Sequence, residues 1–247
     1  MADNHLKLNE EKTQIIWLGT RQQLNKVTAR ALILPNATVE FSTTVKDLGV
    51  VLDSQLTMAD HIAALSRSCF FYIRQLGAIR QSLTPDAMKT LVYAFVSSRI
   101  DYCNSILTGV SGQLLQRLQS VQNAAARLVT GARRSEHMTP ILRQLHWLPV
   151  RQRIIFKTAV LVYKCRHGMA PPYLSIYCQP TSSHGGRCHL RSAESGQLTV
   201  PRTRTSYGDR SFAVHGPVVW NSLPAELRLL NMSLPVFRKR LKMFLFN

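Results

Sequence analysis

The sequence predicts a mainly α fold with a small antiparallel β element at the N-terminus, an α+β arrangement. Apolar residues recur with helical spacing through most of residues 56–180 and again near the C-terminus. Short apolar runs separated by turn residues are confined to the first 55 residues. We therefore expect a helical bundle that follows a small β element and precedes an irregular C-terminal appendage.

The predicted strands lie close together in the sequence. Residues 12–19 form an apolar run ended by glycine, which predicts one strand. Residues 32–34 and 39–41 are separated by a Pro-Asn turn and predict a hairpin. Residues 45–52 predict a further strand, and residues 1–11 read as the end of a helix.

Three helices with recognisable ends are predicted next. The first spans residues 57–79 and carries an apolar stripe. The second starts at Thr84-Pro85, where threonine is a good N-cap and proline a good first helical residue, and extends to residue 100. The third spans residues 111–130, and Gly131 stands where a C-terminal cap belongs.

A central helix is predicted after a short one. Thr139-Pro140 reads as the N-cap and first residue of the short helix. From Ile154 to Tyr163 the chain is apolar on every side except at Lys157 and Thr158, which is typical of a buried helix.

The C-terminal part is less regular. After Pro180 the chain is polar and rich in glycine and serine, which predicts a loop, and residues 198–201 predict a short strand. A last helix starts near Ser233. Its predicted buried stripe consists of Val236, Leu241, Phe244 and Leu245.

The charge is strongly positive and unevenly distributed. The 247 residues include 31 Lys and Arg against 13 Asp and Glu, a net charge of +18. Residues 1–55 carry six of each sign, residues 56–180 carry 15 and 4, and residues 181–247 carry 10 and 3. Such a basic block indicates a phosphate-bearing partner, with a merely solvated basic surface as the alternative. These three segments also define the predicted domains.

Membrane insertion and secretion are not indicated. No apolar run reaches the roughly 18 residues of a membrane-spanning helix, and the N-terminus lacks the apolar core of a signal peptide. The five cysteines are odd in number, which favours reduced thiols over a disulfide framework. We expect an intracellular protein, in the cytoplasm, the nucleus or both.

Residues 165–189 could hold a zinc ion or pack without one. Six potential ligands lie close in sequence: Cys165, His167, Cys178, His184, Cys188 and His189. Only His184 and Cys188 have a plausible ligand spacing, whereas structural zinc sites favour two closely spaced pairs. We expect no metal site, with Cys165 and Cys178 packing as small apolar residues. Trp147 reads as a core anchor.

Several long motifs resemble one family. The segments HLKLNEEKT, VKDLGVVLD, LQSVQNAAARLVTG, LHWLPVRQRI and WNSLPAELR are similar, in this order, to the C-terminal part of the reverse transcriptase of non-LTR (LINE-type, jockey-like) retrotransposons. The resemblance covers nearly the whole chain. It implies the end of a palm with a primer-grip-like hairpin over residues 1–55, a helical thumb over 56–180, and a linker with a basic helical segment over 181–247.

The resemblance also implies where chemistry is missing. Polymerases hold two Mg²⁺ ions between close carboxylates, which in this family include a Phe/Tyr-Ala-Asp-Asp hairpin. This sequence lacks that tetrapeptide, and its aspartates are scattered. We therefore predict no catalytic residue, no cofactor and no polymerase activity for this chain alone, with Mg²⁺ belonging to the full enzyme.

Candidate contacts with nucleic acid follow from the same resemblance. Lys12 matches a lysine near the incoming nucleotide, and Leu48, Gly49 and Val50 match the primer grip, where glycine permits close approach to the backbone. The predicted phosphate contacts are basic residues of the thumb-like region: Arg67, Arg74, Arg127, Arg133, Arg134, Arg143, Arg151, Arg153, Lys157 and Lys164.

The sequence thus predicts a reverse transcriptase fragment that binds RNA, DNA or their hybrid. Two alternatives remain: a helical scaffold for an acidic protein, and a decayed element without selected function. Binding to phosphates would weaken steeply with salt, whereas a scaffold would show a flat dependence. Apolar surface left exposed in the fragment would also favour self-association.

Overall fold

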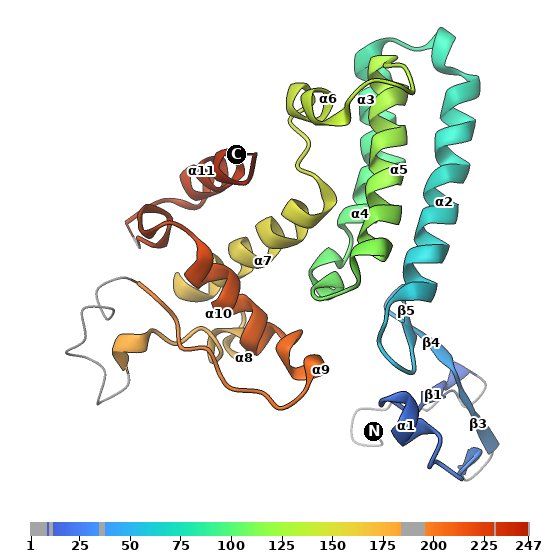
Figure 1. Cartoon of the computed structure of the whole chain (residues 1–247), viewed down its shortest axis with the longest axis vertical. Coiled ribbons are helices and arrows are strands. Elements are labelled where there is room, and N and C mark those ends of the chain that lie inside the picture. Colours follow the sequence, from blue (N-terminus) through green and yellow to red (C-terminus); the bar gives the residue numbers. More distant parts are fainter. Residues whose placement is uncertain (1–8, 10–11, 35–37, 184–195, 230, 247) are drawn as a thin grey trace. The chain divides into compact units, whose positions relative to one another are not determined.

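The fold was determined as a computed structural model (Figure 1). It describes residues 9, 12–34, 38–183, 196–229 and 231–246. The chain forms two compact units. Unit 1 contains residues 1–68 and 110–117, and unit 2 contains residues 69–109 and 118–247. Helices α2 (Ala59–Ala78) and α5 (Gly112–Thr130) contribute residues to both.

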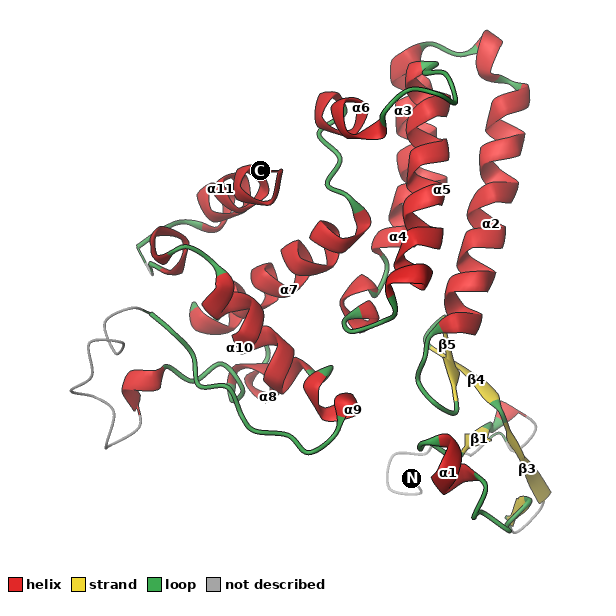
Figure 2. Ribbon diagram, viewed as in Figure 1, coloured by secondary structure: helices red, strands yellow, loops and turns green. Residues whose placement is uncertain are grey.

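The strands of the described chain all lie in unit 1 (Figure 2). In chain order the elements before α2 are β1 (Ile15–Ile16), α1 (Arg21–Leu24), β2 (Ala31–Ile33), β3 (Thr38–Ser42), β4 (Thr44–Asp47) and β5 (Val50–Asp53). The first three strands form a sheet in the order β1-β3-β2. The predicted hairpin is confirmed by the antiparallel β2–β3 pair. Strand β1 pairs with β3 in parallel, so this sheet is mixed.

The predicted single strand over residues 45–52 is wrong, because the chain reverses within it. Strands β4 and β5 form an antiparallel hairpin in which Asp47 pairs with Val50. The two turn residues, Leu48 and Gly49, have φ of 44° and 87°. Two consecutive left-handed residues are typical of the type I′ turn, whose twist matches that of the flanking strands. Alternation alone did not reveal the turn because leucine is an uncommon residue in its first position.

Unit 2 consists of helices and connecting turns. Its α-helices after α2 are α3 (Pro85–Val92), α4 (Ser98–Asp101), the C-terminal part of α5, α6 (Met138–Gln144), α7 (Val150–Arg166), α8 (Pro172–Ser175), α9 (Ser206–Asp209), α10 (Phe212–Ser222) and α11 (Leu234–Phe246). Shorter helical turns are η3 (Arg80–Ser82), η4 (Tyr93–Ser97), η5 (Asn104–Leu107), η6 (Thr181–Ser183) and η8 (Ala225–Arg228). With the small sheets of unit 1, this content confirms the mainly α fold class.

Several predicted helix ends are confirmed. The Thr84 side chain accepts a hydrogen bond from the Ala87 amide and caps α3. Gly131 has φ of 78°, and its amide donates to the Arg127 carbonyl at 2.8 Å, which ends α5. Glycine suits this position because it has no Cβ to clash in the left-handed region.

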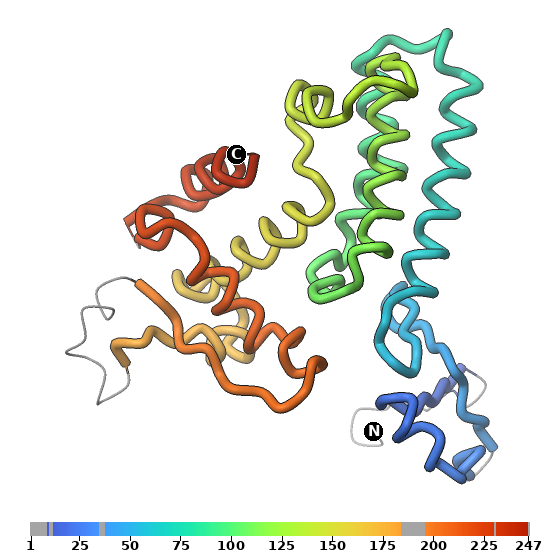
Figure 3. Tube along the Cα trace, in the orientation of Figure 1, coloured from blue at the N-terminus to red at the C-terminus, as the bar shows by residue number. Residues whose placement is uncertain are grey.

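Helix α7 is central to unit 2, as predicted. Its residues pack against α10 and α11, and Figure 3 shows the three traces close together. The Tyr163 hydroxyl donates to the Met232 carbonyl, and the Tyr163 ring stacks on Phe237 at 4.4 Å. Trp220 is fully buried in the same core, and its indole nitrogen donates to the Gly196 carbonyl at 2.9 Å.

Three other predictions are corrected by the structure. The helix predicted from residue 85 to 100 contains a π-helical turn, η4, between α3 and α4. Helix α6 starts at Met138, so Thr139 lies inside its first turn and is not the N-cap. Leu198 makes an isolated bridge with Pro180 and does not start a strand.

The buried face of α11 differs from the predicted stripe. Phe237 and Leu241 are fully buried, whereas Val236 and Phe244 are about two-fifths exposed. Phe237 and Leu241 are four residues apart and therefore share one helix face. Leu241 of the predicted stripe is thus confirmed, and Leu245 packs against the same core, whereas the prediction is wrong for Val236 and Phe244. Val236 and Phe237 are both apolar, so the pattern did not show which of the two faces the core. Among the described helices, none is long and apolar enough to cross a membrane.

Candidate nucleic-acid interface

A cavity of about 560 Å³ in unit 2 gathers basic and aromatic side chains. Its walls come from α3, η4, α4, η5, α7, α11 and the segment that follows α6. The lining residues are Lys89, Tyr93, Asp101, Asn104, Leu145, His146, Trp147, Leu148, Arg153, Phe156, Lys157, Arg238 and Lys242. Five of these side chains are cations, and one is a carboxylate.

The cations are presented by pairs of residues four positions apart on helices. Arg153 and Lys157 form such a pair on α7, and Arg238 and Lys242 form another on α11. Residues at this spacing lie on the same helix face, one turn apart. Lys89 on α3 completes the set. Three helices that are distant in the sequence therefore direct positive charge into one cavity.

Arg153 is held in place by two partners. Its Nη1 lies 2.8 Å from Asp101 Oδ2, and its Nε donates to the Leu148 carbonyl at 2.8 Å. Its side chain is 13% exposed. A guanidinium fixed in this way keeps its charge and its position, because neither has to be reorganised when an anion arrives.

Lys242 shows the electrostatic character of the cavity. Burial lowers the pKa of its ammonium group, and the nearby charges of Arg153 and Lys89 lower that pKa further. Desolvation and like charges both disfavour the protonated form of a lysine. An anion bound beside Lys242 would remove the second of these costs. Asp101, the carboxylate of the cavity, is already paired with Arg153.

The structure brings together two of the ten predicted thumb-like contacts, Arg153 and Lys157. The others do not line the cavity. Exposed side chains elsewhere are those of Arg67, Arg74, Arg133, Arg134, Arg143 and Arg151, while Arg127 and Lys164 are half-buried. Two of these arginines have backbone partners: Arg127 Nη2 donates to the Arg134 carbonyl at 3.4 Å, and Arg143 Nη2 donates to the Phe246 carbonyl at 2.9 Å.

Sequence reasoning missed three cations of the cavity: Lys89, Arg238 and Lys242. Arg238 and Lys242 lie outside the buried stripe that the sequence predicted for the last helix. Their spacing of four residues was the available signal, since it matches the spacing of Arg153 and Lys157. Only the packing of α11 against α7 brings the two pairs together.

The candidate residues of unit 1 lie in its β region. Lys12 is exposed, and its backbone amide donates to Asn9 Oδ1 at 3.1 Å. Leu48 and Gly49 form the tip of the β4–β5 hairpin, where the Leu48 side chain is 83% exposed. Val50 is buried. The hairpin therefore presents an apolar side chain and a flat glycine backbone at its tip.

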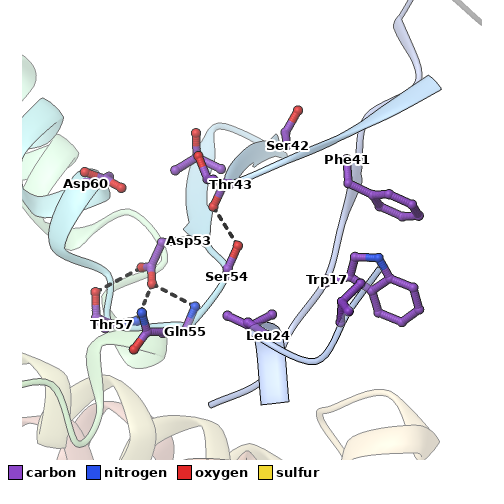
Figure 4. A pocket seen from close by; sticks show the side chains of 12 residues that line it. Trp17, Leu24, Phe41, Ser42, Thr43, Asp53, Ser54, Gln55, Thr57 and Asp60 are labelled. Carbon is purple, nitrogen blue, oxygen red and sulfur yellow. Dashed lines mark hydrogen bonds between the residues drawn. The ribbon is translucent and has the colours of Figure 1, made fainter. Parts of the chain in front are cut away.

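A second cavity, of about 530 Å³, lies in unit 1 (Figure 4). Trp17 and Phe41 form part of its wall, with ring centroids 5.3 Å apart. Asp53 and Asp60 also line it. The Asp53 carboxylate accepts from the backbone amides of Gln55, Thr57 and Met58 and from the Thr57 hydroxyl, so it acts as a cap at the start of α2.

The structure describes three of the six potential zinc ligands: Cys165, His167 and Cys178. Cys165 and Cys178 are buried in the core around α7. Burial raises the pKa of both thiols, that of Cys178 to about 12, as is typical of cysteines that pack in apolar surroundings. His184, Cys188 and His189 lie outside the described residues.

Comparison with known proteins supports one relationship. No protein-family model matches the sequence, and no solved structure matches it. The "Probable RNA-directed DNA polymerase from transposon BS" of Drosophila melanogaster is 29% identical over 152 residues. The match covers 60% of this chain and 17% of that relative, so the similarity spans less than a fifth of the relative's length. It supports a relationship to the reverse transcriptases of retrotransposons.

Proposed function

We propose that this chain is the C-terminal part of a non-LTR retrotransposon reverse transcriptase and that unit 2 binds nucleic acid through its basic cavity. The observation that carries the proposal is the convergence of five cations on a cavity whose carboxylate is already paired. The ligand class is RNA, DNA or their hybrid, recognised through phosphates. The similarity to a transposon polymerase supports the same ligand class.

The chemistry proposed for unit 2 is binding and positioning. Arg153 offers a fixed charge, whereas Lys89, Lys157 and Arg238 are exposed and can follow the spacing of successive phosphates. Lysine and arginine contacts of this kind set affinity and orientation but read no base sequence. DNA synthesis itself is assigned to residues outside this chain, as is Mg²⁺ binding.

The β4–β5 hairpin is proposed to approach the primer strand. Gly49 at its tip has no side chain to keep a sugar-phosphate backbone away, and exposed Leu48 offers an apolar contact beside it. Lys12 is proposed to lie near an incoming nucleotide in the complete enzyme. Self-association through exposed apolar side chains also stays a prediction, as does an intracellular location.

The salt dependence of binding tests the main proposal. Fluorescence anisotropy with a labelled RNA–DNA hybrid should show affinity falling steeply with salt, with a slope of about 0.9 per phosphate contacted. Replacing Lys157 or Arg238 by glutamate should weaken binding and lower the slope by about 1 each or more.

Lys239→Glu is the matched control, because Lys239 is exposed on α11 but does not line the cavity. It changes the net charge as much as Arg238→Glu does. Equal losses for these two variants would show that only overall charge matters, and the cavity would then not be the binding site. A flat salt slope together with tight binding to an acidic protein would favour the scaffold alternative.

A further inference from the structure

We infer that the basic cavity of unit 2 receives an unpaired nucleotide, with its base stacked on Tyr93 and its phosphate among the cations. This inference rests on the proposed function and specifies its ligand as single-stranded nucleic acid. The inference is based on the aromatic side chains of the cavity and not on its charge.

Tyr93 is placed for stacking. Its backbone amide donates to the Lys89 carbonyl one helical turn earlier, so both side chains lie on the same face and both line the cavity. The Tyr93 side chain is 63% exposed. It lies at the start of the π-helical turn η4, and such turns inside helices are frequent at functional sites.

Tyr72, by contrast, has the contacts of a tyrosine with a structural role. Tyr72 stacks on Phe95 with ring centroids 5.2 Å apart, and the Arg99 guanidinium lies 4.7 Å from the centre of the Tyr72 ring. Within the described chain, no comparable ring or cation contact is found for Tyr93. With 63% of its side chain exposed, part of the Tyr93 ring is accessible to a ligand.

The cavity has the volume and composition of a small-ligand site. About 560 Å³ falls within the range of roughly 300–1,000 Å³ typical of such pockets. Trp147, Leu148 and Phe156 supply apolar wall, while Asn104 and Asp101 supply polar groups beside the cations. A phosphate-binding surface alone needs cations but no aromatic or apolar wall, so the combination points to a base together with its phosphate.

An unpaired base fits this arrangement better than a duplex. Inside a duplex both faces of each base are covered by its neighbours, so Tyr93 could stack only at a duplex end. Single strands expose those faces, and aromatic side chains bind them by stacking with little sequence preference. The cations that flank Tyr93 supply the contacts to the strand's phosphates.

The test compares oligonucleotides with and without bases at one salt concentration. We expect a labelled single strand to bind about tenfold more tightly than an abasic strand with the same number of phosphates, as measured by fluorescence anisotropy. Tyr93→Ala should remove most of this difference while leaving affinity for the abasic strand unchanged. Tyr93→Phe should retain it, because stacking requires the ring and not the hydroxyl.

The matched control is Tyr173→Ala, since Tyr173 on α8 is 66% exposed and does not line the cavity. It should bind both strands as the unchanged protein does. Equal binding of the two strands, or equal loss in both tyrosine variants, would overturn the stacking inference and leave phosphate binding intact. If no oligonucleotide binds with a salt-dependent affinity, the proposed function itself fails. Circular dichroism of each variant confirms that it is folded.

Discussion

Asp53 organises the most strained part of the described backbone. Leu56 and Met58, close behind it, have φ of 50° and 64°, in the left-handed region that costs a non-glycine residue roughly 1–2 kcal/mol. The Asp53 carboxylate offsets this cost by accepting from several amides of the same turn, including that of Met58 at 2.7 Å. A single side chain thereby sets how the β4–β5 hairpin leads into α2.

Replacing Asp53 by alanine should therefore destabilise unit 1. Hydrogen bonds to a charged acceptor contribute roughly 1.5–3 kcal/mol each, and their loss is not additive, so we expect a loss of about 2–4 kcal/mol. Denaturant unfolding of the variant measures it. Asp47→Ala serves as the control because Asp47 is an exposed residue of β4. Equal effects of the two substitutions would contradict the role assigned to Asp53.

The junction between β5 and α2 also contains a buried histidine. His61 lies in the first turn of α2, and the Val51 amide donates to its Nδ1 at 3.4 Å. Burial lowers the pKa of the His61 imidazole below its ordinary value of 6.5. A ring nitrogen that accepts a hydrogen bond must be unprotonated, so geometry and burial agree on the neutral form.

This histidine should make unit 1 sensitive to acid. Because the folded pKa lies below the unfolded one, the unfolded chain binds more protons as pH falls below about 6.5. The free energy of unfolding should then fall by up to about 1.4 kcal/mol per pH unit until the folded pKa is passed. Thermal unfolding between pH 7.5 and 5 measures this dependence. It should become weaker in His61→Gln, and an unchanged dependence would exclude His61 as its source.

Two phenylalanines of α11, Phe237 and Phe244, differ in how much they should contribute to stability. Phe237 is fully buried against Tyr163 and Trp220, with ring centroids 4.4 and 5.9 Å away, whereas Phe244 is 40% exposed. Phe237→Ala should lower the free energy of unfolding of unit 2 by about 3–5 kcal/mol, because removing this large side chain leaves a cavity in the core. Phe244→Ala should cost much less. Equal losses of unfolding free energy for the two variants, measured by denaturant unfolding, would contradict the assignment of Phe237 rather than Phe244 to the buried face.

For the chain as a whole, the charges of the basic cavity lower stability while they favour binding. Burial and the charges of Arg153 and Lys89 lower the pKa of Lys242, so its charge is unfavourable in the folded protein at neutral pH. A bound phosphate would reverse that effect. The positive charges gathered in this cavity therefore favour ligand binding but not folding.

We expect Lys242→Met to raise the melting temperature while weakening nucleic-acid binding. Methionine keeps much of the apolar stem and removes the charge, so the repulsion disappears together with one phosphate contact. The gain in stability should vanish above about pH 10.5, where the lysine would be neutral in both states. Differential scanning calorimetry and anisotropy on the same variant measure both effects. A lower melting temperature with unchanged affinity would refute this trade-off.

Much of the fold was predictable because local rules decide it. The Thr84-Pro85 start, the Gly131 end and the buried character of α7 depend on capping, backbone freedom and apolar periodicity, which all act within a few residues. Apolar alternation missed the reversal at Leu48-Gly49 and the place of Phe237 in the buried face of α11 for a related reason. A leucine in a type I′ turn and a run of adjacent apolar residues both leave the local pattern ambiguous. The resemblance to the primer grip, by contrast, implied a hairpin at Leu48-Gly49.

The basic cavity could be predicted only in part. Charge counts indicated phosphate, and the spacing of four residues between Arg153 and Lys157 can be seen in the sequence alone. The meeting of Lys89, Arg238 and Lys242 with that pair depends on contacts between segments up to 153 residues apart in the chain, as the numbering of Lys89 and Lys242 shows. Composition thus indicated the kind of partner, whereas only the packing of α3, α7 and α11 decided where charge and an exposed tyrosine ring come together.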